Sequence, residues 1–166
     1  TTLLRDMKMN TKIFECSYQE MLKFKELDKV IIDYVHTTNI DLIKKKAEDQ
    51  EQFVEDVLIA YGNLSRSEET HFIMVTNEQD ELVGLCVYVM QYYEHALAKT
   101  AHIDVIFLEK EWRIHGNGTA FMKFIFENAK KNGAKLCYVS ANSDTKTDKG
   151  FSKMFKPAYN IYVKEL

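Results

Sequence analysis

A glycine-containing segment in the second half of the chain has the composition of an anion-binding turn. Gly116 and Gly118 follow Arg113, and they lie between a predicted strand at 101–108 and a predicted helix at 119–132. The first amides of a helix lack intrahelical acceptors and lie at the positive end of the helix dipole. Because glycine has no Cβ, an anion can approach these amides, and the Arg113 guanidinium can add charge. A diphosphate suits such a turn.

Three interpretations of the turn remain open on residue types alone. A nucleotide-binding P-loop requires Gly-Lys-Ser/Thr, whereas Gly118 is followed by Thr119 and Ala120. A dinucleotide-binding fingerprint requires a third glycine, which the segment lacks. A glycine loop that only connects a strand to a helix is the third interpretation. The neighbouring elements are needed to choose between them.

The hydrophobic pattern predicts a mixed α and β chain of the α+β class with one central sheet. A capping box at Ser17 and Glu20 begins the first predicted helix, and Gly62 is expected to end the second. The crossover from 101–108 to 136–141 requires a parallel pair of strands. Strands are predicted at 11–16, 71–76, 82–92, 101–108, 136–141 and 159–164, and helices at 17–36, 41–61, 119–132 and 148–155.

The composition favours one folded domain over residues 1–166. The chain is 46% hydrophobic with ten Phe and nine Tyr, which excludes a disordered chain. No apolar run approaches the ~20 residues that span a bilayer, and residues 1–10 lack a signal-peptide core. The net charge of -3 disfavours a dedicated nucleic-acid binder, although lysines gather in the last quarter.

The cysteines predict a reducing, cytoplasmic location and no metal site. Cys16, Cys86 and Cys137 are odd in number, far apart and set among apolar neighbours. Such cysteines are typical of reduced core thiols, and no His, Cys or carboxylate group has zinc-ligand spacing.

The segment Arg113-Ile114-His115-Gly116-Asn117-Gly118-Thr119-Ala120 resembles the acyl-CoA-binding motif Arg-x-x-Gly-x-Gly-x-Ala of the GNAT superfamily of N-acetyltransferases. The order of predicted elements resembles that family over nearly the whole chain. The resemblance implies a single GNAT-like acyltransferase domain, with a mostly antiparallel mixed sheet in which a parallel pair diverges into a V. It also implies acetyl-CoA as cosubstrate and direct attack by an amine.

The resemblance further implies which residues contact the cosubstrate. The backbone of Arg113 to Ala120 would bind the CoA diphosphate. Phe107, Leu108 and Glu109 would pair with the pantetheine arm. The segment from Tyr138 to Asn142 would form the opposite wall of the cleft, so Asn142 is a candidate contact.

His102 and Asp104 are the candidate bases. An amine attacks only when it is neutral, and free lysine has a pKa of about 10.4, so a group must remove its proton. The two residues alternate on a predicted strand, which places them on one face, and family members often carry His or Glu at the matching positions. His102 has the better intrinsic pKa for neutral solution. For each residue, a role as an ordinary strand side chain stays open.

The proton donor to the departing thiolate is less defined. The family commonly has a tyrosine in its last helix before a Gly-Phe pair, where this chain has Met154 or Phe155 and then Ala158-Tyr159. Tyr159 or Tyr138 is therefore the candidate acid, or the thiolate leaves without help.

The acceptor site is expected between the first two helices and the loop at 92–95, which is aromatic and acidic and suits a cationic amine. The leading hypothesis is an N-acetyltransferase for a primary amine of a small molecule, peptide or protein. A non-catalytic module that binds CoA or another protein is the second. An acyltransferase for an amine carried by nucleic acid is the third. A homodimer, common in the family, is a further expectation.

Overall fold

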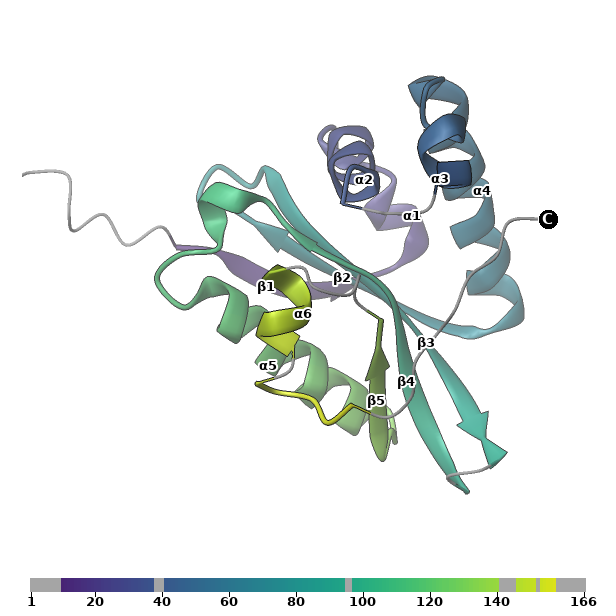
Figure 1. The fold of residues 1–166 in the computed structure, drawn as a ribbon, viewed down its shortest axis with the longest axis vertical. Helices are drawn as coiled ribbons and strands as arrows, with labels where there is room; N and C mark the ends of the chain where they lie inside the picture. Colours follow the sequence, from purple (N-terminus) through teal and green to yellow (C-terminus); the bar gives the residue numbers. More distant parts are fainter. Residues whose placement is uncertain (1–9, 38–40, 95–96, 141–145, 152, 158–166) are drawn as a thin grey trace, which may run out of the picture.

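The computed structural model describes residues 10–37, 41–94, 97–140, 146–151 and 153–157. Five strands form one sheet in the order β1-β2-β3-β4-β5 (Figure 1). The first three neighbouring pairs are antiparallel and β4–β5 is parallel, so the mixed sheet and the predicted crossover are confirmed. The predicted strand at 159–164 lies outside the described residues. The strands are β1 Lys12–Cys16, β2 Glu69–Thr76, β3 Leu82–Tyr93, β4 Ala98–Leu108 and β5 Leu136–Val139.

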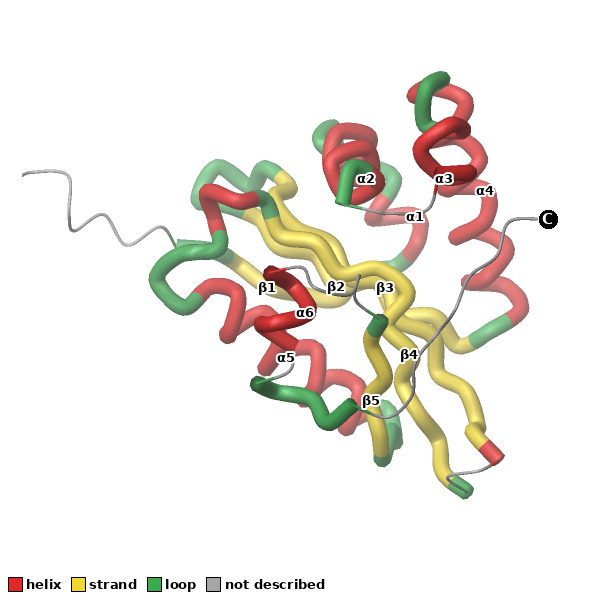
Figure 2. The backbone as a smooth tube through the Cα atoms, in the orientation of Figure 1, coloured by secondary structure: helices red, strands yellow, loops and turns green. Residues whose placement is uncertain are grey.

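Helices cover both faces of the sheet (Figure 2). One face packs against α1 Tyr18–Met21, α2 Leu27–Val35 and α4 Gln50–Ser67, with α3 Asp41–Lys46 leading into α4. The other face packs against α5 Asn117–Lys131, and Phe151 of α6 Lys146–Phe151 joins that second core. The central strand β3 is buried from Leu82 to Met90 because both of its faces are covered. No described helix is both long enough and apolar enough to cross a membrane.

The helix predicted at 17–36 is two helices. The capping box is confirmed: Ser17 Oγ accepts from the Glu20 amide at 3.2 Å, and the Glu20 carboxylate accepts from the Ser17 amide at 2.7 Å. The helix nevertheless ends at Met21, and α2 begins at Leu27. Tertiary contacts explain the break, because Phe24 packs near the Phe14 ring and the Glu26 carboxylate accepts from the Leu82 amide at 3.2 Å.

The second predicted helix is also divided, and the role predicted for Gly62 is wrong. Asp49 begins α4 by accepting from the Gln52 amide at 3.2 Å, and α4 continues to Ser67. Gly62 is a buried residue inside α4 rather than its end. A Cβ at this position would lie 2.9 Å from Tyr18 Oη, which donates to the Leu58 carbonyl at 2.8 Å. The glycine therefore makes room for α1.

Gly62→Ala is expected to lower the free energy of unfolding by about 1–3 kcal/mol, because Tyr18 must move from a bonded position. This result is opposite in sign to the helix propensity of alanine, which favours it over glycine by about 1 kcal/mol. Urea unfolding measures the effect. In a Tyr18→Phe background, which lacks the nearest atom, the cost of Gly62→Ala should shrink. A neutral or stabilising Gly62→Ala in the wild-type background would show that the contact is not tight.

The remaining boundaries differ from the predictions by a few residues. The hairpin of β3 and β4 is longer than predicted, because β4 begins at Ala98 and shortens the expected connection at 95–100. Helix α5 begins two residues early, at Asn117, and α6 spans Lys146–Phe151 rather than 148–155.

A polar cluster fixes α5 to the sheet. Tyr88 Oη of β3 donates to Asn128 Oδ1 of α5, and Asn128 Nδ2 donates to Glu15 of β1 at 2.8 Å. Asn132 Nδ2 donates to Tyr88 Oη at 3.2 Å, while the His71 ring stacks on Tyr88 at 4.7 Å and bonds to Glu15. These bonds set the position of the helix whose first turn carries the glycines.

The cluster predicts a pH dependence of stability that Glu15→Gln should reduce. Burial alone raises the pKa of Glu15, but hydrogen bonds with Asn128 and His71 outweigh it and lower that pKa from 4.5. A lowered carboxyl pKa stabilises the fold above pH 4.5, and this contribution is lost as pH falls through the folded pKa. The wild type should therefore be more stable than Glu15→Gln at pH 7, and the gap should narrow by pH 3.

Urea unfolding at pH 7, 5, 4 and 3 measures this gap, with Glu78→Gln, an exposed turn residue, as the control. A gap that stays constant between pH 7 and pH 3 would contradict the assignment to the Glu15 carboxylate.

Candidate active site

The glycine turn joins the end of β4 to α5 through a tight reversal of the chain. A single 3₁₀ turn, η2 Lys110–Trp112, follows β4. His115 and Gly116 then take left-handed φ values of 52° and 81°, and Gly116 is the N-cap of α5. A left-handed φ is uncommon for a side chain such as His115 and natural for glycine. Two such residues in succession make the sharp reversal that leads into α5.

Two of the first four amides of α5 have backbone acceptors, and two have none among the described residues. The Ala120 amide donates to the Gly116 carbonyl at 2.9 Å, and the Asn117 amide donates to the Ile114 carbonyl at 3.0 Å. In the part of the chain that the structure describes, the amides of Gly118 and Thr119 donate to no backbone or side-chain acceptor. A Cβ placed on Gly116 or Gly118 would meet no atom within 4 Å. The turn therefore has both the donors and the open space that a diphosphate needs.

The Arg113 side chain, which is expected to add positive charge to the turn, contacts the end of β4. Its Nε donates to the Leu108 carbonyl at 2.6 Å, and its guanidinium carbon lies 5.6 Å from the centre of the Phe107 ring. The side chain thus braces the turn against the end of β4. Its positive charge stays beside the turn.

Strand β4 has an edge that no described strand pairs with. Its parallel pairing with β5 covers only Thr100 to Ile103, opposite Leu136 to Val139. Strand β4 then continues to Leu108, paired with β3 on its other side alone (Figure 1). The Asp104 and Leu108 carbonyls accept from the Tyr34 and Arg113 side chains. Apart from these two bonds, the backbone from 104 to 108 has no partner on this side among the described residues, so an extended ligand could pair with it as an added strand would.

A β-bulge marks the point where β4 and β5 separate. Val87 pairs with Val105 and Tyr88 pairs with Ile103, so Asp104 is the extra residue of β4. Ile103 packs in the core beneath α5, whereas Val105 packs in the core beneath the other helices. The bulge therefore reverses which side chains of β4 point towards α5. It comes directly after Ile103, the last residue of β4 that pairs with β5.

His102 faces the helical layer of α1 to α4, because Ala101 and Ile103 on either side pack towards α5. The Tyr138 ring of β5 stacks on it at 5.0 Å and 27°, and the Tyr93 ring lies at 6.3 Å, edge-on. Partial burial lowers the pKa of His102 below 6.5, which favours the neutral imidazole near pH 7.

A hydrogen bond sets the tautomer of His102. Thr100 Oγ1 donates its single hydrogen to the Gln91 carbonyl at 3.1 Å, and it lies 2.9 Å from His102 Nε2. The hydroxyl can then only accept from the ring, so Nε2 carries the hydrogen. The lone pair of the neutral ring is on Nδ1.

Asp104 is exposed, yet crowding by its neighbours raises the pKa of its carboxyl from 3.8 through partial loss of hydration. Tyr34 Oη of α2 donates to the Asp104 backbone carbonyl at 3.4 Å. Burial raises the pKa of Tyr34 and Tyr61, and the charge of Asp104 adds to both shifts. The sequence indicates Tyr34 and Tyr61 only as members of apolar helix faces, so neither is identifiable as a neighbour of this carboxylate.

Both the backbone amide and the side chain of Glu109 already have partners. Its amide donates to the Val83 carbonyl at 2.9 Å, and its side chain forms an ion pair with Lys29 of α2. Phe107 and Leu108 bury their side chains in opposite cores, so only their backbone can meet a ligand along this edge.

The remaining predicted site residues divide into described and undescribed ones. Ile114, His115, Thr119 and Ala120 are exposed around the turn. Tyr159 and Asn142 lie outside the described residues. Phe155 packs against the rings of Phe126 and Phe151, with centroids at 5.4 and 5.5 Å, and Met154 is exposed.

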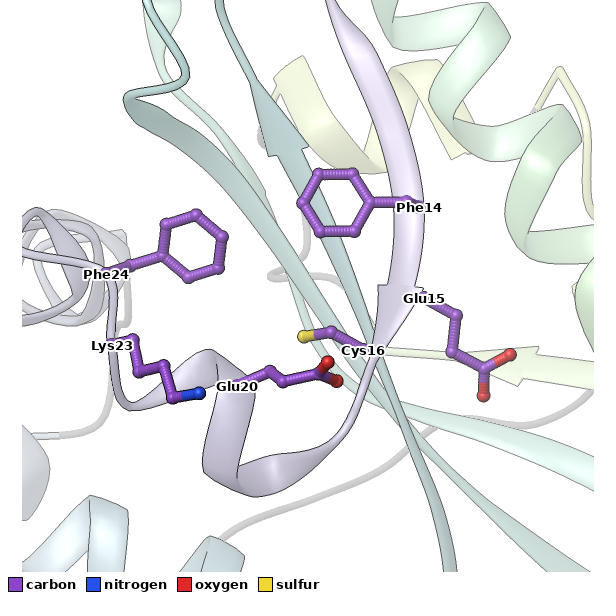
Figure 3. Close-up of a pocket in the computed structure, with 6 residues that line it drawn as sticks. All are labelled: Phe14, Glu15, Cys16, Glu20, Lys23 and Phe24. Atoms are coloured by element: carbon purple, nitrogen blue, oxygen red, sulfur yellow. The ribbon is translucent and has the colours of Figure 1, made fainter.

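A separate depression of about 290 Å³ lies at the opposite edge of the sheet (Figure 3). Phe14 and Cys16 of β1 face Glu20, Lys23 and Phe24 across it, while Glu15 points away. Strands β2 and β3 separate β1 from β4, so this depression is distinct from the glycine turn. Among the described residues, no group of three or more His, Cys, Asp or Glu side chains is arranged to hold a metal ion.

The bulged strand, its open edge and the glycine turn define an acyltransferase fold. The sequence model of the Acetyltransferase (GNAT) family matches residues 34–151, and the chain belongs to that family. The resemblance to the GNAT superfamily is thereby confirmed, and acetyl transfer is the general chemistry of the protein. GNAT proteins in general use acetyl-CoA.

Solved structures share the fold at low sequence identity. A Pyrococcus furiosus protein, provisionally assigned as an acetyl transferase, has a TM-score of 0.71 at 21% identity, covering 95% of this chain and 99% of its own. The ribosomal-protein-alanine N-acetyltransferase of Brucella melitensis biovar Abortus 2308 has a TM-score of 0.68 at 11% identity, and the match covers 95% of this chain and 99% of that protein. The aminoglycoside acetyltransferase meta-AAC0020 from an uncultured soil metagenomic sample has a TM-score of 0.62 at 15% identity, and the match covers 94% of this chain and 93% of that protein. No curated protein matches the chain in sequence.

Proposed function

We propose that the protein is an N-acetyltransferase that moves the acetyl group of acetyl-CoA to a primary amine of a small molecule, peptide or protein. One observation carries the proposal. The open amides of Gly118 and Thr119 lie at the end of a turn that begins where the unpaired edge of β4 stops. A ligand with a diphosphate and an extended acylated arm matches this arrangement.

The backbone of Arg113 to Ala120 would hold the CoA diphosphate, with Gly118 and Thr119 as the donors that have no other acceptor. The arm would run along β4 towards Asp104, using the backbone of Phe107 and Leu108. The thioester would then lie at the bulge, where β4 leaves β5.

His102 would accept the proton of the attacking amine at Nδ1, directly or through a water. The amine nitrogen bonds to the thioester carbonyl carbon, and the carbon–sulfur bond breaks with its electron pair leaving on sulfur. Backbone amides near the bulge are suited to stabilise the oxyanion. Asp104, with its raised carboxyl pKa, is the second candidate base.

Tyr159 stays the candidate acid for the thiolate. A CoA thiolate can also leave without help near neutrality, so the reaction does not depend on this tyrosine.

Calorimetric titration with acetyl-CoA and with acetyl-pantetheine tests the proposal. Acetyl-CoA should bind, and acetyl-pantetheine, which lacks the diphosphate, should bind far more weakly. Thiol release with a panel of polyamines, amino acids, aminoglycosides, peptides and nucleic acids then tests turnover. Absence of binding at millimolar acetyl-CoA would contradict the proposal.

A non-catalytic CoA-binding module is the second candidate function. It is favoured by Met154 and Phe155, one of which stands where the family commonly has its tyrosine; neither can donate a proton, and Phe155 packs against other phenylalanines. Tight acetyl-CoA binding without thiol release for any amine would select it. An acceptor on nucleic acid would instead show binding that weakens steeply with salt.

A further inference from the structure

A groove of about 910 Å³ lies between α2 and α4, apart from the cosubstrate turn. It is lined on α2 by Asp28, Lys29, Ile32 and Asp33, and on α4 by residues between Gln50 and Ile59. The α2 residues that line the groove are not Leu27, Val30 and Ile31, which α2 buries on the sheet. Ten residues of α4 extend over about 14 Å, which is longer than a single small amine requires.

The floor of the groove is apolar and partly open to solvent. Leu22 and Ile59 are 38% and 53% exposed, although both are large hydrophobic residues. The Tyr18 hydroxyl, bonded to the Leu58 carbonyl at 2.8 Å, holds α1 against α4 at the groove. An open apolar floor of this kind is typical of a surface that binds another molecule. The floor is formed by Leu22, Ile32, Val54, Leu58 and Ile59.

The rim of the groove is acidic. It carries Asp28, Asp33, Glu51 and Glu55, and Lys29 is the one cation among the described residues that line the groove. The Lys29 ammonium binds Asp33 at 2.8 Å and also pairs with Glu109, so its charge is already matched. An apolar floor with an acidic rim is complementary to an amphipathic segment rich in lysine and arginine.

Helix α2 links the groove to the candidate active site. Lys29 on the rim pairs with Glu109, directly after β4. Tyr34, the residue after Asp33, bonds to the Asp104 carbonyl on the other side of the helix. A helix is about 10 Å across, and an extended chain advances about 3.3 Å per residue. A few residues of an extended polypeptide bound in the groove would therefore reach the bulge at Asp104.

We propose that the groove docks a lysine- and arginine-rich amphipathic segment of a protein acceptor, so that the acetylated amine is carried by a polypeptide. The choice of acceptor rests on the proposed function, whereas the docking itself does not. The apolar side chains of the segment occupy the floor, and its cations face Asp28, Glu51 and Glu55, the rim carboxylates that Lys29 does not pair with.

Fluorescence anisotropy with two labelled 14-residue peptides tests the docking in the absence of acetyl-CoA. One peptide places leucines along a helical stripe with lysines elsewhere, and the other replaces the lysines by glutamines. The lysine peptide should bind, with an affinity that falls as salt rises, and the glutamine peptide should bind about tenfold more weakly or worse. Equal affinity for the two peptides would overturn the proposal.

Charge reversal locates the binding. Glu51→Lys with Glu55→Lys should weaken the lysine peptide by about tenfold or more. Glu78→Lys with Glu127→Lys changes the net charge equally at exposed positions outside the groove and should have little effect. Equal weakening by both pairs would overturn the proposal, since net charge alone would explain it. A dimer in sedimentation that Ile59→Glu dissociates would also overturn it, because a second copy would then fill the groove.

Turnover with a small amine separates the two proposals. The Glu51→Lys, Glu55→Lys variant should keep small-amine turnover and show a raised KM for the lysine peptide. Peptide docking without acetylation of any amine would contradict the proposed function and support the groove. Small-amine acetylation without peptide docking would support the proposed function and overturn the proposal that the groove docks a polypeptide.

Discussion

Replacement of Gly118 by valine is expected to weaken acetyl-CoA binding by about a hundredfold or more and to leave the fold intact. Two charge-assisted hydrogen bonds from the amides of Gly118 and Thr119 are each worth about 1.5–3 kcal/mol, and about 2.7 kcal/mol is a hundredfold in affinity. The valine side chain would occupy the space that the diphosphate needs. A Cβ at Gly118 meets no atom within 4 Å, so the protein without ligand accommodates it.

Calorimetry with acetyl-CoA measures the affinity, and urea unfolding measures the stability. The unfolding free energy should stay within about 1 kcal/mol of wild type, because valine and glycine both rank low as helix formers. Gly118→Ala should lie between wild type and valine. Lys130→Val, an exposed position near the other end of α5, controls for a β-branched residue in the same helix.

Acetyl-pantetheine provides the internal control, because it has no diphosphate to lose. Gly118→Val should leave its weak affinity unchanged. If Gly118→Val bound acetyl-CoA as tightly as wild type, the diphosphate would have to bind elsewhere.

The second large effect is expected for His102→Gln, which should lower kcat/KM by about 10²–10⁴, the usual contribution of a general base. Burial lowers the pKa of His102, so the imidazole is neutral at pH 7, and the bond to Thr100 leaves the lone pair on Nδ1. In the wild type, kcat/KM should therefore fall as pH drops below 6.5 through this lowered pKa. This fall on the acid side of the pH–rate profile, the acid limb, should be absent in the variant.

Asp104→Asn and His36→Gln complete the comparison. Asp104→Asn should lower kcat/KM by less than His102→Gln and keep the acid limb in place. His36→Gln, an exposed histidine at the end of α2, should behave as wild type. A large loss and a missing acid limb in Asp104→Asn, with both retained in His102→Gln, would assign the base to Asp104 instead.

Local chemistry made several elements predictable from the sequence. The capping box at Ser17 and Glu20 and the glycine turn at Gly116 and Gly118 depend on neighbouring residues only, and the structure has both. The parallel crossover follows from the strand–helix–strand order, and it is confirmed.

Features that arise from distant contacts could not be predicted in this way. The break after Met21 depends on Glu26 bonding to Leu82, and Gly62 is needed because of Tyr18, 44 positions earlier. The bulge at Asp104 is defined only by its register with β3. The hydrophobic pattern of one strand does not determine its register with a partner strand.

The site residues show the same division. The turn was recognisable from its glycines, whereas the brace from Arg113 to Leu108 and the ion pair of Glu109 with Lys29 depend on the folded geometry. Tyr159 and Asn142 lie outside the described residues, so their roles stay predictions.

The most direct test of the central claim is an amide NMR titration of the ¹⁵N-labelled protein with CoA. We predict that the largest shifts occur at the amides of Gly118 and Thr119, followed by those of residues 104–108 on β4. Saturable binding that leaves these amides unchanged and shifts other parts of the chain would contradict the account.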